Sequence, residues 1–241
     1  MIRFVVFVFL AMPLSLRAQL TVSGAAGIGT FKMDDLHSLQ NQILSQFPVE
    51  GKITSSFPSY LFYQGSVKWI FARNYVVGLS YEYGSTGGRV YYRDYSGTLY
   101  SDQRLHYYQV NVDFGLMKDF PRSFFLELDL KPGINLSRLE IADYQNIGGL
   151  DFAQSINVKS INIVLQPTLS VIKRWRNIGF QLMGGYHFTI NAGKLHPKGN
   201  RDVYLVDTKN EKVNANWSGV RLGVGIIGYV KNKKRDELAS E

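Results

Sequence analysis

The sequence of 241 residues contains no cysteine, and it has only 7 prolines and 4 histidines. Without cysteine the chain cannot be a small secreted domain held together by disulfides. With so few histidines it also offers few candidate general bases, because histidine is the residue that acid–base catalysis uses most often. Glycine, by contrast, occurs 23 times. Plentiful glycine with scarce proline is typical of a chain built from many strands.

Long hydrophobic runs are absent after residue 18, so the sequence predicts no transmembrane helix, which would need about 20 apolar residues. The stretch that opens the chain, "MIRFVVFVFLAMPLSLRAQ", carries basic Arg3, an apolar run from Phe4 to Leu14, and a polar segment that ends at Ala18. This layout predicts a signal peptide over residues 1–18, cleaved before Gln19. An uncleaved membrane anchor is disfavoured, because roughly 11 apolar residues are too few to span ~30 Å.

Strict alternation of apolar and polar residues is the dominant pattern in the rest of the chain. In "SFFLELDLKPG" one side of an extended strand carries apolar residues from Phe124 to Leu130, and the other carries Glu127, Asp129 and Lys131. A half-buried soluble strand alternates in the same way, so the pattern alone does not say which side faces out. Eight segments alternate: Leu20–Phe31, Tyr60–Phe71, Tyr75–Tyr83, Tyr107–Met117, Phe124–Leu136, Ile161–Ile172, Ile178–Ile190 and Ser218–Val230.

The connections between these segments alternate in length. Three are short, namely Ala72–Asn74, Lys118–Arg122 and Lys173–Asn177. The four between them are long: Lys32–Ser59, Gly84–His106, Ser137–Ser160 and Asn191–Trp217. Outer-membrane barrels have short periplasmic turns and long extracellular loops, whereas an immunoglobulin-like sandwich does not sort its loops in this way. The sequence therefore predicts an all-β fold, an eight-stranded antiparallel up-and-down transmembrane β-barrel, with the apolar parity facing lipid.

The chain resembles the small outer-membrane β-barrel proteins of Gram-negative bacteria, particularly the barrel families of Bacteroidota-type organisms. The resemblance rests on the export signal ending "RAQ", on the glycine-rich strands "VSGAAGIGTF" and "VRLGVGIIGYV", and on tyrosine-rich hairpins. It implies residence in the outer membrane, with residues 19–230 forming the barrel. Many such barrels end on an aromatic residue, but here "VKNKKRDELASE" follows Tyr229. Either the signal for the insertion machinery is internal, or the tail projects into the periplasm, and residues 231–241 are predicted to form a basic periplasmic tail.

Charged residues of both signs fall on the parity that faces the lumen of the predicted barrel. At eight strands the interior is just filled by side chains or holds one small ligand. These charges could line a gated ion path, or they could neutralise one another in a polar core. The second interpretation is favoured, because an unpaired buried charge costs several kcal/mol. The predicted lumen network comprises Lys68, Glu82, Asp113, Glu127, Asp129, Lys131 and Arg221.

The first long connection contains "MDDLHSLQNQILSQF", Met33–Phe47, in which apolar residues recur at helical spacing after Asp34 and Asp35. We expect a short helix in this first extracellular loop. It could lie on the barrel rim or partly over the mouth, or it could serve as a lid or a partner-binding helix.

A tyrosine-rich hairpin, "RVYYRDYSGTLYSDQR" (Arg89–Arg104), is predicted to continue two strands beyond the membrane. Its residues Tyr91, Tyr92, Tyr95 and Tyr100 form a candidate binding surface, since tyrosine offers contact area and hydrogen bonding at low entropic cost. The predicted function is that of a non-enzymatic outer-membrane protein with a structural or surface-binding role. Its expected partners are outer-membrane lipid and an extracellular or envelope protein, and it is expected to be a monomer.

Two other function classes remain open. One is an accessory barrel of a protein secretion system. The other is a barrel enzyme acting on lipid, for which His187 is the lumen-facing histidine, with Ser80, Ser170 and Asp129 as conceivable partners. No recognisable catalytic triad, cofactor site or metal site follows from the sequence. The basic runs "KRWRN" and "KNKKR" are better explained by a membrane surface than by nucleic acid.

Overall fold

The computed structural model describes residues 19–45, 51–71, 74–95, 97–147, 150–197, 199, 202–206 and 212–230. The predicted signal peptide (1–18) and the predicted basic tail (231–241) lie outside these ranges. Within the described residues no helix has both the length and the apolar character needed to cross a bilayer.

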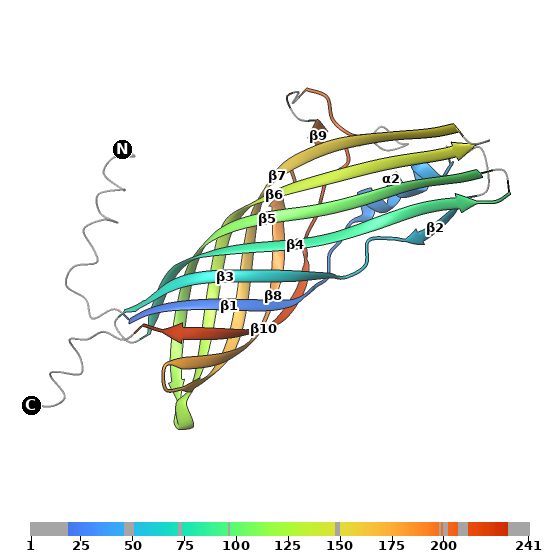
Figure 1. The fold of residues 1–241 in the computed structure, drawn as a ribbon. Coiled ribbons are helices and arrows are strands. Elements are labelled where there is room, and N and C mark those ends of the chain that lie inside the picture. Colours follow the sequence, from blue (N-terminus) through green and yellow to red (C-terminus); the bar gives the residue numbers. More distant parts are fainter. Residues whose placement is uncertain are drawn as a thin grey trace, which may run out of the picture.

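Eight strands form a closed antiparallel ring (Figure 1). Consecutive members of the ring pair with each other, and β1 pairs with both β3 and β10, which closes the barrel between its first and last strands. The predicted eight-stranded antiparallel barrel is confirmed. In chain order the ring strands are β1 (Gln19–Gly29), β3 (Tyr60–Phe71), β4 (Tyr75–Arg93), β5 (Gly97–Phe120), β6 (Phe124–Ile147), β7 (Leu150–Trp175), β8 (Ile178–Asn191) and β10 (Gly219–Tyr229).

Glycines allow close packing at the seam where β1 meets β10. A Cβ atom at Gly27 would collide with the carbonyl oxygen of Leu222 and with the ring of Phe62. Gly27 therefore has a structural cause, because the inward ring of Phe62 and the backbone of β10 occupy the space that a side chain would need.

The barrel has the inverse polarity of a soluble protein. On β6, Leu128 faces outward and is 53% exposed, whereas the inward-facing Glu127 and Asp129 are 2% and 1% exposed. The same alternation of exposed apolar and buried polar residues runs along the other ring strands. Because the closed ring leaves no sheet edge in its apolar band, and the band itself faces outward, this surface is suited to hydrocarbon rather than water.

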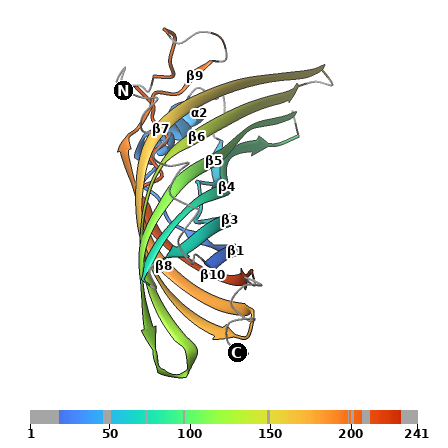
Figure 2. The same ribbon diagram turned by 90° about the vertical axis from the view of Figure 1, so that its left-hand side faces the viewer.

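Four strands extend well beyond the ring at the end opposite the start of β1 and the end of β10 (Figures 1 and 2). Strands β4 to β7 have 19 to 26 residues, against 11 to 14 for the other ring strands. The β4–β5 pairing continues to Arg93 opposite Thr98, as predicted for this hairpin. The connection predicted over residues 137–160 is instead almost entirely a hairpin, since β6 and β7 pair as far as Ile147 opposite Leu150. We call these extensions the projecting sheet, their side the loop end, and the opposite side the turn end.

Smaller elements fill the mouth of the barrel at the loop end. Helix α2 (Asp34–Ser45) covers most of the predicted Met33–Phe47, whose last two residues lie outside the described ranges. Strand β2 (Lys52–Ser55) pairs with β4, and β9 (His196–Pro197) pairs with β7. At the opposite, turn end, a 3-10 turn (Pro121–Ser123) joins β5 to β6. The helix contributes to an apolar core whose buried members include Met33, Leu36, Leu39, Tyr107, Leu195 and Trp217.

Candidate functional site: the filled lumen and the projecting sheet

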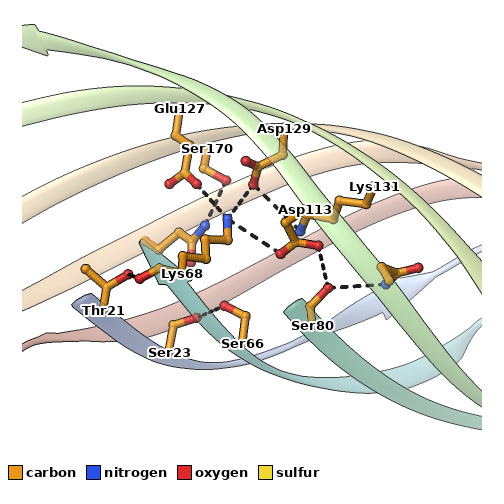
Figure 3. A network of polar contacts seen from close by, with 12 residues as sticks. Thr21, Ser23, Ser66, Lys68, Ser80, Asp113, Glu127, Asp129, Lys131 and Ser170 are labelled. Atoms are coloured by element: carbon orange, nitrogen blue, oxygen red, sulfur yellow. Dashed lines mark hydrogen bonds and ion pairs between the residues drawn. The ribbon is translucent and has the colours of Figure 1, made fainter. Parts of the chain in front are cut away.

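Lys68 lies at the centre of a group of charges in the lumen (Figure 3). Its Nζ is 2.6 Å from Oε1 of Glu127, 2.5 Å from Oδ2 of Asp129 and 3.9 Å from Oδ2 of Asp113. Strands β3, β5 and β6 supply these residues, and their side chains are at least nine-tenths buried. Lys131 adds a second ammonium group, 3.9 Å from Oδ2 of Asp129.

A second charged group lies nearer the loop end. Arg221 on β10 forms an ion pair with Glu82 on β4, and the Tyr107 hydroxyl donates a hydrogen bond to the same carboxylate. The guanidinium carbon lies 5.7, 5.6 and 5.2 Å from the ring centroids of Tyr60, Phe62 and Tyr107. These rings surround the cation with aromatic faces, an arrangement that stabilises a desolvated guanidinium.

The structure thus brings all seven predicted lumen charges into ion pairs, in two separate groups. A cavity lined by Lys68, Glu127 and Tyr229, among others, measures only about 10 Å³, which is room for about one water molecule. The ion pairs, together with the small size of the cavity beside Lys68, favour the mutually neutralising polar core over a continuous ion path.

Amide and hydroxyl side chains fill the space around the two charged groups. Asn162 donates to Ser137 over 3.1 Å, and the same hydroxyl accepts a 2.8 Å hydrogen bond from Nε1 of Trp217. Trp217 is fully buried and packs against Tyr107, with ring centroids 4.5 Å apart and the ring planes tilted by 59°. Trp217 could not be singled out from the sequence, because it stands at the end of a long connection where alternation carries no signal.

His187 is fully buried in the lumen, as its parity predicts. Among the described side chains its hydrogen-bonding neighbour is Gln166, whose Oε1 lies 3.4 Å from Nδ1. The candidate partners are engaged elsewhere: Ser80 donates to Asp113, Ser170 accepts from Gln181, and Asp129 binds Lys68. The structure therefore does not assemble His187 with the serines and the carboxylate that a nucleophilic site would need.

The four tyrosines of the predicted binding surface do not lie on one face. Tyr91 and Tyr100 are directly opposite each other on β4 and β5, whereas Tyr92 points to the other side of the sheet and Tyr95 lies in the turn. Tyr100 stacks instead on Tyr144 of β6, with ring centroids 4.9 Å apart. We call Tyr91, Tyr100 and Tyr144 the tyrosine row. Only the register of β5 with β6 reveals Tyr144 as its third member.

Polar contacts hold the tips of the projecting sheet in place. Arg89 forms an ion pair with Asp102 on the face of the tyrosine row, and its guanidinium carbon is 5.7 Å from the ring centroid of Tyr100. At the β6–β7 tip the Tyr144 hydroxyl and the Asn146 amide donate to Asp151, over 2.6 and 2.5 Å. These hydrogen bonds lower the pKa of the Asp151 carboxyl, so it stays ionised and keeps accepting them.

The two edges of the projecting sheet differ. On the β4 side, β2 covers the edge at residues 89–91. On the β7 side, β9 pairs only with Val158 and Lys159, and β8 pairs from Ile163 onward, so residues 150–157 have no partner strand on this side within the described chain. The uncovered stretch is also apolar in part, since Leu150 is 80% exposed and Phe152 57%. An open edge with exposed apolar side chains is a site where another strand can pair.

No protein-family model matches the chain, and no curated protein matches it. Solved structures similar to it include surface protein A of Neisseria (13% identity, TM-score 0.44, covering 88% of this chain and 97% of that one). Others are Ail of Yersinia pestis (10%, 0.36, 88% and 96%) and the N-terminal β-barrel domain of Pseudomonas aeruginosa OprF (10%, 0.30, 89% and 100%). These TM-scores are below 0.5, so the fold is assigned from the strand pairing of this chain and not from the similar structures.

Proposed function

We propose that this chain is an outer-membrane barrel of a Gram-negative cell that displays the projecting sheet outside the membrane. In this orientation the loop end is extracellular and the turn end is periplasmic, as short turns and long loops are arranged in outer-membrane barrels. The protein acts without catalysis, by holding a rigid binding surface above the bilayer.

The observation that carries the proposal is the division of the chain into a filled barrel and an exposed sheet. The lumen is occupied by paired charges, and the mouth by an apolar core that includes helix α2. The helix packs Leu36 and Leu39 into that core, which favours a structural role for it over that of a mobile lid. At the loop end, the projecting sheet is the described part of the chain that stays accessible to another protein.

The open edge of β7 suggests how that sheet would bind. An extended segment of an extracellular or envelope protein could add a strand along residues 150–157, with main-chain hydrogen bonds for affinity. Alternate side chains of the edge, among them Leu150, Phe152 and Ile156, would contact the apolar residues of the added strand. The tyrosine row would offer contact area on the other face of the sheet, since Tyr144 stands directly opposite Ala153, which points away from the face of Phe152.

A photo-crosslinking side chain at Phe152, in intact cells, is expected to capture a protein partner. The same group at Tyr81, which is 49% exposed in the apolar band, is the matched control and should contact only lipid. Changing both Tyr100 and Tyr144 to Ser should weaken the capture at Phe152 and leave barrel folding intact. If no protein is captured at Phe152, or if external protease does not reach this hairpin, the surface-binding role is wrong.

The other function classes have no specific support in this structure. A secretion-system accessory role would use the same exposed surface, and the photo-crosslinked partner would identify it. An enzymatic role would need a nucleophile beside a base, and His187 has amide Gln166 as its neighbour instead. Membership of a Bacteroidota-type barrel family stays a proposal that rests on the signal ending and the glycine-rich strands.

A further inference from the structure

Basic residues gather at two neighbouring short turns of the turn end. Residues 118–123 and 173–177, at the β5–β6 and β7–β8 turns, contain five basic residues and one acidic residue, Asp119. The turns are neighbours because β6 pairs with both β5 and β7, which brings Phe120, Phe124 and Lys173 into one cross-strand row. We call the exposed residues Lys118, Arg122, Lys173 and Arg176 the basic collar.

The lysines of the collar stand on the lipid-facing side of the barrel. Lys118 follows the outward parity of Leu116 on β5, and Lys173 follows that of Val171 on β7. Each ammonium group is held beside an aromatic ring: Lys118 Nζ lies 5.5 Å from the ring centroid of Phe120, and Lys173 Nζ lies 4.3 Å from that of Phe124. Exposed aromatic rings at the end of an apolar band mark the headgroup level of a bilayer.

The two arginines of the collar occupy positions that favour glycine. Arg122 has φ 61° and Arg176 has φ 57°, in the left-handed region that residues with a Cβ atom adopt at a cost. Each tight turn therefore carries an arginine where glycine would fit with less strain. Lys173 also donates a hydrogen bond to the carbonyl oxygen of Arg122, so the two turns are tied together.

We infer that the basic collar binds the phosphate of an anionic phospholipid in the leaflet at the turn end. The collar contributes four cations, and the two turns contain one carboxylate, that of Asp119. The net charge is therefore positive and attracts an anionic headgroup. The acyl chains would run along the exposed leucines next to the collar, Leu116 and Leu128, which lie opposite each other on β5 and β6. Arg174 is not part of the site, because its guanidinium is already engaged. The guanidinium carbon lies 4.1 Å from the ring centroid of Tyr229, and Nε donates a hydrogen bond to the carbonyl oxygen of Arg176.

Lipid retention on the detergent-solubilised barrel tests this inference by native mass spectrometry. The barrel is expected to retain phosphatidylglycerol in preference to phosphatidylethanolamine. The double substitution Lys118→Gln and Lys173→Gln should weaken phosphatidylglycerol binding by about tenfold or more, since each basic residue near a membrane surface contributes to binding anionic lipid. The matched control neutralises two exposed basic residues at the loop end, Arg138→Gln and Lys159→Gln, and should leave the binding unchanged.

Two further arms keep the result unambiguous. The charge-preserving double variant Lys118→Arg and Lys173→Arg should retain the lipid, which separates loss of charge from loss of folding. Inorganic phosphate at the same concentration as the lipid should not displace it. Equal retention of both lipids, unchanged binding in the glutamine variant, or displacement by inorganic phosphate would each overturn the inference. None of these outcomes depends on whether the projecting sheet binds a protein.

Discussion

Replacing Lys68 with methionine is expected to lower the free energy of unfolding of the barrel by about 3–5 kcal/mol. The substitution removes the ammonium group that lies within 4 Å of three buried carboxylates, those of Asp113, Glu127 and Asp129. Like charges would then face one another beside a cavity of only about 10 Å³, which has room for about one water molecule. Urea unfolding of the barrel in lipid vesicles measures the loss.

Neutralising the carboxylates should recover most of that stability. The triple variant Lys68→Met, Glu127→Gln and Asp129→Asn keeps the side-chain volumes of the lumen and removes the excess negative charge. Replacing a buried ion pair as a whole is often close to neutral, whereas removing one partner is not. A single Lys68→Met variant as stable as the wild type would show that these groups do not neutralise one another in the folded barrel.

Arginine in place of Leu128 is expected to destabilise the inserted barrel by roughly 2–4 kcal/mol if the residue lies near the bilayer midplane. Leu128 is 53% exposed on the outer surface, and its neighbours across the sheet are Leu116 and Leu169. The guanidinium would therefore enter hydrocarbon. Folding yield into vesicles, read as the fraction of barrel that resists SDS without heating, reports the effect.

The adjacent residue provides the matched control for that substitution. Asp129→Asn lies on the opposite face, where it removes one carboxylate from the group around Lys68 and introduces nothing into lipid. This variant should still insert. Equal tolerance of both changes would mean that the assigned faces of β6 are wrong.

The strand faces could be predicted from the sequence because alternation is a local property. Each inward residue such as Glu127 follows an outward residue such as Leu126, and the short turns fix the up-and-down order. The lengths of β6 and β7 could not be predicted in the same way. Beyond the apolar band both faces of the hairpin are polar or mixed, so alternation of hydrophobicity fades while the backbone pairing continues to Ile147.

Contacts between distant strands could not be predicted from the sequence. Alternation assigns Lys68 and Arg221 to the lumen, but only the register determines that Lys68 meets Glu127 whereas Arg221 meets Glu82. The grouping of the four tyrosines could not be predicted for a related reason. Adjacent residues point to opposite faces, which separates Tyr92 from Tyr91, and the stacking partner Tyr144 comes from a different hairpin.

The central claim, a closed membrane-spanning barrel, is tested most directly by fractionating cells that express the full chain and comparing heated with unheated gel samples. We predict that the protein is recovered with the outer membrane, resists extraction by carbonate and urea, and migrates differently before and after heating because the closed barrel survives SDS. Recovery as a soluble periplasmic protein with no heat-dependent shift would contradict the account.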